Sequence, residues 1–218
     1  KGYAPKTLLN SYDNERIPAA DENILNSIRS TNFMTPKSKA SEEFREAVFS
    51  LSEVMPFARL LVNSGRLSAP HFYKGSPLNS MDDPLFEAKG PRPGEPSIDT
   101  AVSDGNDTIW LLTQLGTEFC LLLFVDKPSF ISSKTRRLRD LADSFKPKMN
   151  LIFVSNHEIS DQNGALILSD KHKTCFKKWA AKPGSVYLIR PDQYIAARWK
   201  ASPQLKEIEH AFEKAMGH

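Results

Sequence analysis

The stretch VYLIRPDQYIAARW, residues 186–199, limits the fold of this chain more than any other part of the sequence. Its two arms, 186–189 and 194–199, are rich in β-branched and aromatic residues, which suit the pleated, half-buried surface of a strand. Between the arms, Pro191 presets a turn and Asp192 can hydrogen-bond its own backbone. Two strands alone are marginally stable, so this hairpin needs further strands or a helix against it. Candidate partners are residues 119–126, 149–155 and 203–216.

The sequence after residue 97 predicts an α/β domain. One continuous apolar run, 119–125, suits a central strand that is covered on both faces, and residues 149–155 (MNLIFVS) predict another buried strand. A helix between them is predicted from the stripe Leu138, Leu141, Ala142 and Phe145. Short strands are expected at 98–103 and 164–168, helical turns at 111–115 and 173–180, and a last helix with Ser202 as N-cap and Pro203 at its first position. This order predicts a thioredoxin-like domain over residues 97–218, with a mixed sheet and flanking helices.

The first part of the chain predicts helices. Residues 7–33 and 38–61 repeat apolar side chains at three- and four-residue steps, and Ser38 or Ser41 can cap the second pattern. Pro18 predicts a kink or break near Ile17, and Pro56 predicts either two helices or one bent helix. Residues 1–62 therefore form a predicted helical segment. Six of the 15 prolines lie in residues 63–96, which predicts an irregular linker between the two parts.

The composition does not indicate a nucleic-acid-binding, membrane-spanning or disulfide-rich protein. The net charge of +3 is small, so no nucleic-acid partner is predicted. No apolar run approaches the roughly 20 residues that span a bilayer, so no membrane partner is predicted either. The two cysteines do not make a disulfide framework, and the default expectation is a reducing, cytoplasmic setting.

The sequence offers no complete site for chemistry. The loop after the first central strand, 126–131, contains no cysteine, Cys120 lies inside the apolar run, and Cys175 lies elsewhere, so no thiol redox activity is predicted. His172 and Cys175 are two ligands, too few for zinc. Asp82-Asp83 before Pro84 is interpreted as a turn or cap. The basic run Lys134, Arg136, Arg137 and Arg139 is interpreted as a solvated helix face. No catalytic, cofactor-binding or metal-binding residue is predicted.

Two segments resemble a known family. Residues 8–24 carry Leu8, Leu9, Ser11, Tyr12, Glu15, Arg16, Pro18 and Ala20, and this pattern is similar to the helix after the second FAD-binding motif of class A flavoprotein aromatic hydroxylases of the phenol hydroxylase type. The hairpin, with Arg190, Pro191, Asp192, Ala196 and Arg198, resembles the end of the thioredoxin-like C-terminal domain of those enzymes, although Ala197 stands where tryptophan is usual. Residues 111–124 look like a third segment of the family.

The resemblance implies the C-terminal part of a longer enzyme. The family's G-x-G-x-x-G, D-G and G-D-A-x-H-x-x-P motifs precede the first helix and are not found in this sequence. Such an enzyme uses FAD and NAD(P)H to hydroxylate an aromatic substrate. For this chain the resemblance implies a non-catalytic portion with a structural or oligomerisation role. Its expected partners are the missing N-terminal FAD-binding domain and further copies of the chain, and no cofactor is expected on the chain itself. The alternative is an independent thioredoxin-like interaction module.

Overall fold

The computed structural model describes residues 5–6, 8–62, 69–126, 137–157 and 166–218. The chain divides into two compact units. The sheet unit comprises Lys1–Ser11 and Tyr73–His218, and the helical unit comprises Tyr12–Phe72. In the described parts of both units, no helix combines the length and the apolar character that crossing a bilayer requires.

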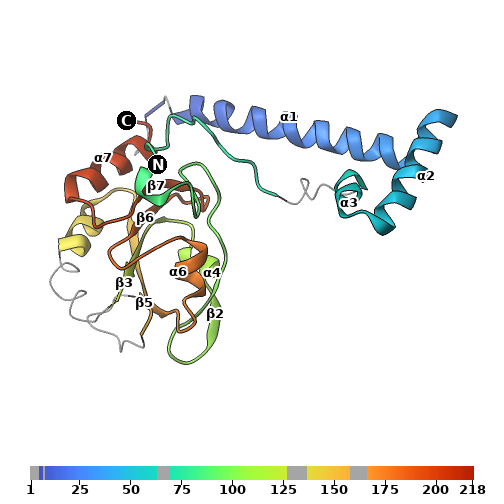
Figure 1. The fold of residues 1–218 in the computed structure, drawn as a ribbon. Helices are drawn as coiled ribbons and strands as arrows, with labels where there is room; N and C mark the ends of the chain where they lie inside the picture. Colours follow the sequence, from blue (N-terminus) through green and yellow to red (C-terminus); the bar gives the residue numbers. More distant parts are fainter. Residues whose placement is uncertain (1–4, 7, 63–68, 127–136, 158–165) are drawn as a thin grey trace. The chain divides into compact units, whose positions relative to one another are not determined.

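The sheet unit is organised around seven strands in the order β2-β1-β5-β4-β3-β6-β7, part of which can be followed in Figure 1. The central strand β3 pairs in parallel with β4 and antiparallel with β6. β5 pairs in parallel with β4, while β7 pairs antiparallel with β6 and β1 antiparallel with both β2 and β5. The strands are β1 (Ala101–Ser103), β2 (Thr108–Trp110), β3 (Phe119–Val125), β4 (Met149–Ser155), β5 (Leu166–Ser169), β6 (Val186–Ile189) and β7 (Ile195–Trp199). The mixed sheet predicted from the sequence is confirmed.

The sheet has a hydrophobic core on each face. Alternate residues of β3 point to opposite sides, so Leu121 and Leu123 belong to one core and Leu122 and Phe124 to the other. All seven residues of β3 are buried, which explains why this strand is a continuous apolar run rather than an alternating one. The first core also contains α7 (Leu205–Ala215) and the described helical residues 137–144; the second contains α4 (Leu111–Leu115) and α6 (Thr174–Lys178).

The predicted start of the last helix is wrong. α7 begins at Leu205, with Gln204 rather than Ser202 at the N-cap. The backbone N–H of Gln204 donates to the Glu207 carboxylate at 2.6 Å, and this contact fixes the first turn. Ser202 instead donates its hydroxyl to the Gly184 carbonyl, so its side chain is used outside the helix. On the buried side of α7, Ile208 and Phe212 face the first core as predicted.

Residues 73–97 run alongside the hairpin. The backbone N–H of Gly94 donates to the Ile195 carbonyl, and that of Ile195 donates to Glu95. The backbone N–H of Ser80 donates to the Ala196 carbonyl. Tyr73, Leu78 and Phe86 are buried, the last of them in the 3-10 helix η2 (Pro84–Phe86). The boundaries predicted for the linker, 63–96, remain a prediction.

The helical unit contains most of α1 (Leu8–Met34) together with α2 (Lys39–Val54) and α3 (Pro56–Val62). Ser38 caps α2 as predicted, because its hydroxyl oxygen accepts the backbone N–H of Ser41. Pro56 begins α3, so the two-helix alternative is the one found. Of the kink or break predicted near Ile17, the break is wrong: α1 continues through Pro18, drawn as one helix in Figure 1. Proline there removes one backbone donor, and the helical residues on both sides maintain the helix.

The smaller elements of the sheet unit were predicted less well. The strand expected at 98–103 is limited to its last three residues, Ala101–Ser103. The adjoining strand β2 was missed altogether. It forms because Asp104 closes a turn, with one carboxylate oxygen accepting the backbone N–H groups of Asn106 and Asp107 at 2.9 Å each. This turn directs Thr108 back beside Ser103.

Candidate functional site

A buried polar cluster surrounds Arg198 on β7. Its Nε donates to Oδ1 of Asp82 at 2.6 Å, and its Nη2 donates to Oδ2 at 2.8 Å. Its Nη1 donates to the carbonyls of Lys89 and Pro91 at 2.6 and 3.0 Å. The guanidinium also lies 4.1 Å from the centre of the Phe86 ring. We call Asp82, Phe86, Arg198 and the two carbonyls the arginine cluster.

The sequence around Asp82 explains how the cluster forms. Asp83 caps η2 by accepting the backbone N–H of Leu85, and its other oxygen accepts the backbone N–H of Lys200. Glu87 and Ala88 both have positive φ angles, 51° and 57°, which turn the chain back after η2. The interpretation of Asp82-Asp83 as a turn or cap is thus right for Asp83. For Asp82 it missed an ion pair with a residue 116 positions away.

Two further polar side chains, those of Tyr187 and Lys200, lie against the Phe86 ring of the cluster. The Tyr187 hydroxyl donates to the Trp179 carbonyl, and the Lys200 ammonium donates to the Ala180 carbonyl. Burial raises the pKa of Tyr187, and burial followed by the nearby charges of Lys182 and Arg198 lowers the pKa of Lys200. These groups have protein partners already. The cluster therefore fits a structural anchor that holds residues 82–91 on the sheet, rather than a centre for acid–base chemistry.

The tip of the hairpin forms a second, smaller cluster. Arg190 donates to the Asp192 carboxylate at 2.7 Å, and the backbone N–H of Gln193 donates to the Arg190 carbonyl at 2.9 Å. Tyr194 stacks on Tyr73 with ring centres 4.3 Å apart. The predicted turn at Pro191-Asp192 is confirmed, and the structure brings its two charged residues together.

The cysteines lie on separate elements, β3 and α6, as predicted. Both are free and buried in the second core. Burial raises the pKa of the Cys175 thiol to about 12 and raises that of Cys120 as well, so neither is a thiolate at neutral pH. The loop in which a redox cysteine would be sought, Lys127-Pro128-Ser129, lies outside the described residues.

The remaining sequence candidates do not converge. His172 is exposed whereas Cys175 is fully buried, so they do not share a metal site. Among the described residues, no group of three or more histidine, cysteine, aspartate or glutamate side chains could hold a metal ion. In the basic run, Arg137 is exposed beside buried Leu138, in agreement with a solvated helix face, and Lys134 and Arg136 lie outside the described residues.

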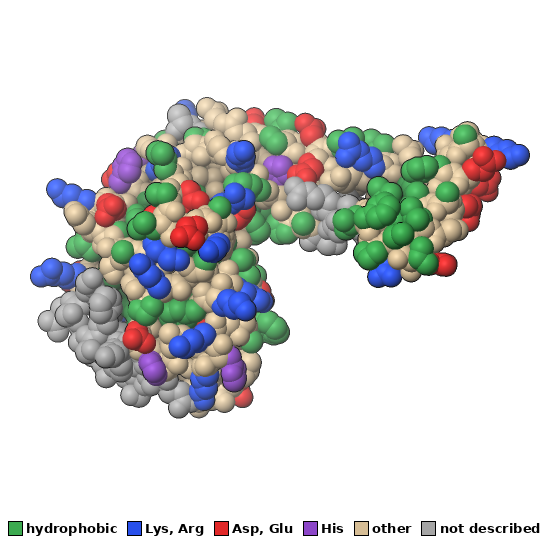
Figure 2. Space-filling view, viewed as in Figure 1, with side chains coloured by type: hydrophobic (Ala, Val, Ile, Leu, Met, Phe, Trp, Pro, Cys, Tyr) green, Lys and Arg blue, Asp and Glu red, His purple; other side chains and the backbone are tan. Residues whose placement is uncertain are grey.

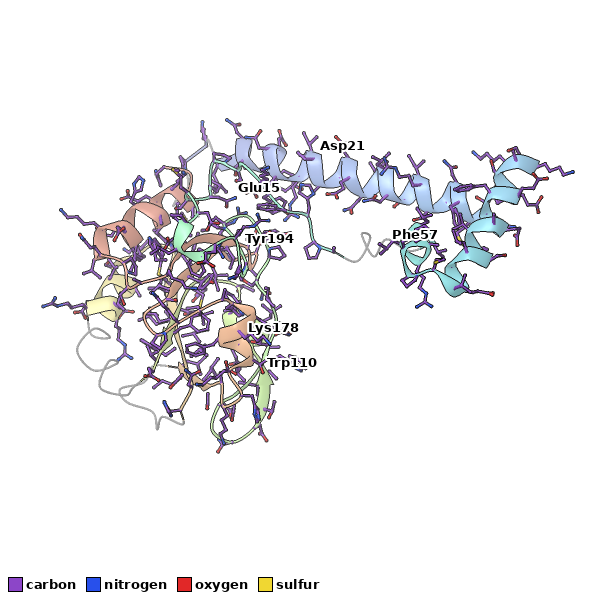
Figure 3. The ribbon with its side chains drawn as sticks, viewed as in Figure 1. Glu15, Asp21, Phe57, Trp110, Lys178 and Tyr194 are labelled. Atoms are coloured by element: carbon purple, nitrogen blue, oxygen red, sulfur yellow. The ribbon has the colours of Figure 1, made fainter. Side chains whose placement is uncertain are left out.

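Many large apolar side chains of the helical unit are exposed. Phe57 and Leu60 on α3 are 60% and 66% exposed, and Val54 at the end of α2 is 72% exposed. Green side chains gather over α2 and α3 in Figure 2, and Figure 3 labels Phe57. We call the following exposed side chains the helical apolar surface: Tyr12, Ile17, Ile24, Leu25, Ile28, Met34, Phe44, Leu51, Val54, Met55, Phe57, Leu60 and Leu61.

On α1, Tyr12 and Ile24 are exposed. The buried positions of α1 are different ones, Ser11, Glu15 and Ala19, which recur every four residues. Hydropathy did not single out this side of the helix, because two of the three residues are polar. The positions of Ser11 and Glu15 within the resembling segment 8–24 are the signal that could have marked it.

The fold is shared with proteins of known structure. Nearly the whole chain superposes on part of flavin-dependent enzymes of known structure. One is the flavin-dependent monooxygenase PieE in complex with FAD and substrate: 19% identity, TM-score 0.61, covering 99% of this chain and 41% of PieE. Another is aklavinone-11 hydroxylase with FAD and aklavinone: 16% identity, TM-score 0.63, covering 100% of this chain and 36% of that one.

A third similar structure is the rebeccamycin biosynthetic enzyme RebC with reduced flavin. It shares 20% identity and a TM-score of 0.59, over 99% of this chain and 38% of RebC. No protein-family model matches the sequence, and no curated protein matches it either. At such low identities the likeness establishes a shared fold. The chain spans 36–41% of the length of the three enzymes.

Proposed function

We propose that this chain is the C-terminal part of a FAD-dependent, NAD(P)H-using monooxygenase that hydroxylates an aromatic substrate, and that it has a structural, non-catalytic role there. The observation that carries the proposal is the coverage: 99–100% of the chain superposes on 36–41% of flavin-dependent enzymes. The resemblance of residues 8–24 and 186–199 to the aromatic hydroxylases supports it independently of the superposition.

The residues of this chain do not fit FAD. A dinucleotide is usually held by a glycine-rich turn between a strand and the N-terminus of a helix. The ten glycines of the sequence are never spaced as G-x-G, and α4 and α6 begin after Trp110 and Lys173. FAD would therefore be held by the rest of the longer enzyme, where it supplies the oxygen chemistry. None is expected on this chain alone.

The proposal includes a thioredoxin-like sheet unit without thiol redox activity. The strand order β4-β3-β6-β7, with β3 and β4 parallel and the last two strands antiparallel, supports the thioredoxin-like assignment. The raised pKa values of Cys120 and Cys175 support the loss of redox chemistry, because a nucleophilic cysteine requires a lowered one. A cytoplasmic location is part of the proposal, since both buried cysteines are free thiols.

The helical apolar surface is the proposed contact with the FAD-binding domain. Burying one large apolar side chain is worth about 1.5–3 kcal/mol, and monomeric proteins rarely expose apolar patches larger than a few hundred Å2. About three fifths of each similar enzyme lies outside the superposed part, which is enough chain for a covering domain. Without that domain, the same surface would favour association between copies of this chain.

The experiment compares this chain with the longer protein that is encoded when the reading frame is extended upstream of residue 1. We expect the longer protein to be yellow with stoichiometric FAD and to oxidise NAD(P)H faster with an aromatic substrate, while residues 1–218 alone are colourless. Light scattering of residues 1–218 should show concentration-dependent association that Leu60→Ser weakens. Leu85→Ser is the matched control, because Leu85 in the sheet unit is 63% exposed and Leu60 is 66% exposed. A reading frame with no upstream G-x-G-x-x-G would overturn the proposal.

The second candidate is an independent thioredoxin-like interaction module. The two-sided core of the sheet unit favours it, because this unit buries its own apolar residues. A strictly monomeric chain with well-ordered α1 and α2 would support this second candidate.

A further inference from the structure

A partly enclosed apolar pocket lies in the sheet unit, beside the ends of two strands. It has a volume of about 200 Å3 and lies between β3, β6, α7 and the helical residues 137–144. Its inner wall is formed by buried side chains, namely Leu123, Val125, Leu138, Phe153, Val186 and Ile208. For comparison, an apolar protein cavity of about 150 Å3 binds benzene. The pocket therefore has the size and the wall chemistry for one aromatic ring.

The rim of this pocket is polar and carries a positive charge. Arg137, which is exposed, belongs to the lining, as do Ser202 and Gln204 on the loop before α7. Leu205, 37% exposed, forms part of the lining at the start of α7. No aspartate or glutamate is among the described lining residues. The charge complementary to this rim is therefore negative.

We propose that this pocket binds a small aromatic carboxylate. The ring lies among the buried aliphatic side chains and Phe153, and the carboxylate faces the Arg137 guanidinium at the rim. A cation at the mouth of an apolar pocket discriminates against neutral molecules of the same shape, because only the anion gains the charge-assisted contact. The site lies within the sheet unit, so it can be tested whatever the outcome for the flavin enzyme.

The test is a titration of the 218-residue chain with phenylacetate, followed by calorimetry or by NMR of the ligand. We expect a Kd of about 1 mM or tighter, in keeping with a ligand of this size. Benzyl alcohol, the neutral probe, should bind several-fold more weakly. Arg137→Gln should weaken phenylacetate binding by about three- to tenfold and leave benzyl alcohol unchanged. Arg139→Gln is the matched control, because Arg139 lies outside the lining of this pocket.

A second variant tests the location of the ring. Leu205→Trp places a bulky side chain in the lining and should abolish binding of both probes. Its control, Leu166→Trp, changes a leucine that is 38% exposed, close to the 37% of Leu205, and that lies outside this pocket. Circular dichroism verifies that each variant folds. Equal affinity for the charged and neutral probes, no binding of either, or full binding to Leu205→Trp would each overturn the proposal.

Discussion

The two units of this chain treat apolar side chains in opposite ways. In the sheet unit, β3 is buried along its whole length and the cores on both faces of the sheet are closed by helices. In the helical unit, α2 buries Val48 alone among its residues and α3 buries only Ala58, while Phe57 and Leu60 are exposed. The sheet unit thus covers its apolar side chains by its own packing, whereas the helical unit leaves large apolar side chains exposed.

The largest expected effect tests this difference directly. Phe124→Ala in β3 removes a fully buried ring that contacts Phe176 edge to face, so it should lower the free energy of unfolding by about 3–5 kcal/mol. Phe57→Ala removes an exposed ring of the helical unit and should change it by less than about 0.5 kcal/mol. Urea unfolding of both variants gives the two values. Similar losses would mean that the helical unit is as tightly packed as the sheet unit.

The arginine cluster should give the next largest effect. Arg198→Met leaves the Asp82 carboxylate and two carbonyls without their donor, and we expect a loss of about 3 kcal/mol. Arg92→Met is the control, because its ion pair with Glu95 is partly exposed and should cost less than about 1 kcal/mol. The same urea titrations measure both. An Arg198 variant as stable as the Arg92 variant would show that residues 82–91 are held by other contacts.

A substitution at Gly90, which lies between the two carbonyls that Arg198 binds, should lower stability by a smaller amount. It has a φ of 67°, and a Cβ added there would lie 2.5 Å from the Trp179 carbonyl oxygen. Gly75 has a similar φ of 76°, but an added Cβ would meet nothing within 4 Å. Gly90→Ala should therefore be less stable than Gly75→Ala by about 1–2 kcal/mol, measured by thermal unfolding. Equal losses would show that the backbone at Gly90 can move away from Trp179.

The smallest expected effect is an alkaline loss of stability in the sheet unit. Folding raises the pKa of both thiols, so the folded chain retains protons that the unfolded chain loses above about pH 9. The free energy of unfolding should fall as the pH rises from 9 to 10, and the Cys175 thiol should contribute less than about 1.4 kcal/mol of this fall. Cys175→Ala should reduce that slope in urea titrations at both pH values. An unchanged slope would mean that other groups control it.

The elements that could be predicted from the sequence are those whose burial leaves a local pattern. β3 and β4 have the predicted bounds. β3 is buried on both faces, so it is recognisable in the sequence as a continuous apolar run. The contact between Arg198 and Asp82 was not predictable from local patterns, because it joins residues far apart in the sequence. The N-cap of α7 was misplaced because Ser202 and Gln204 can both cap a helix, and the side chain of Glu207 decides between them.

In the candidate site too, features set by local residues were predicted, and features set by distant contacts were not. The RPD turn of the hairpin was predicted from local residue chemistry, and the structure adds the ion pair between Arg190 and Asp192. The helical character of α1 was predicted, but its buried side was not, because hydropathy does not identify polar residues such as Glu15 as buried. The apolar pocket is formed where β3, β4, β6, α7 and the helical residues 137–144 meet, and no single stretch of the sequence contains its wall.

The backbone hydrogen bonds between residues 80–97 and the hairpin limit where a strand from another copy of the chain can add to the sheet. An open sheet normally has two edge strands whose unpaired N–H and C=O groups invite strands from other chains. Here Gly94 and Glu95 pair with Ile195, so one edge of the sheet is covered by the chain itself. At the opposite side of the sheet, β2 is three residues long, and β1 pairs with β5 only at Ser103 and Ser169. Strand addition beside β7 therefore finds the described edge already paired, and association on that side is left to side-chain surfaces.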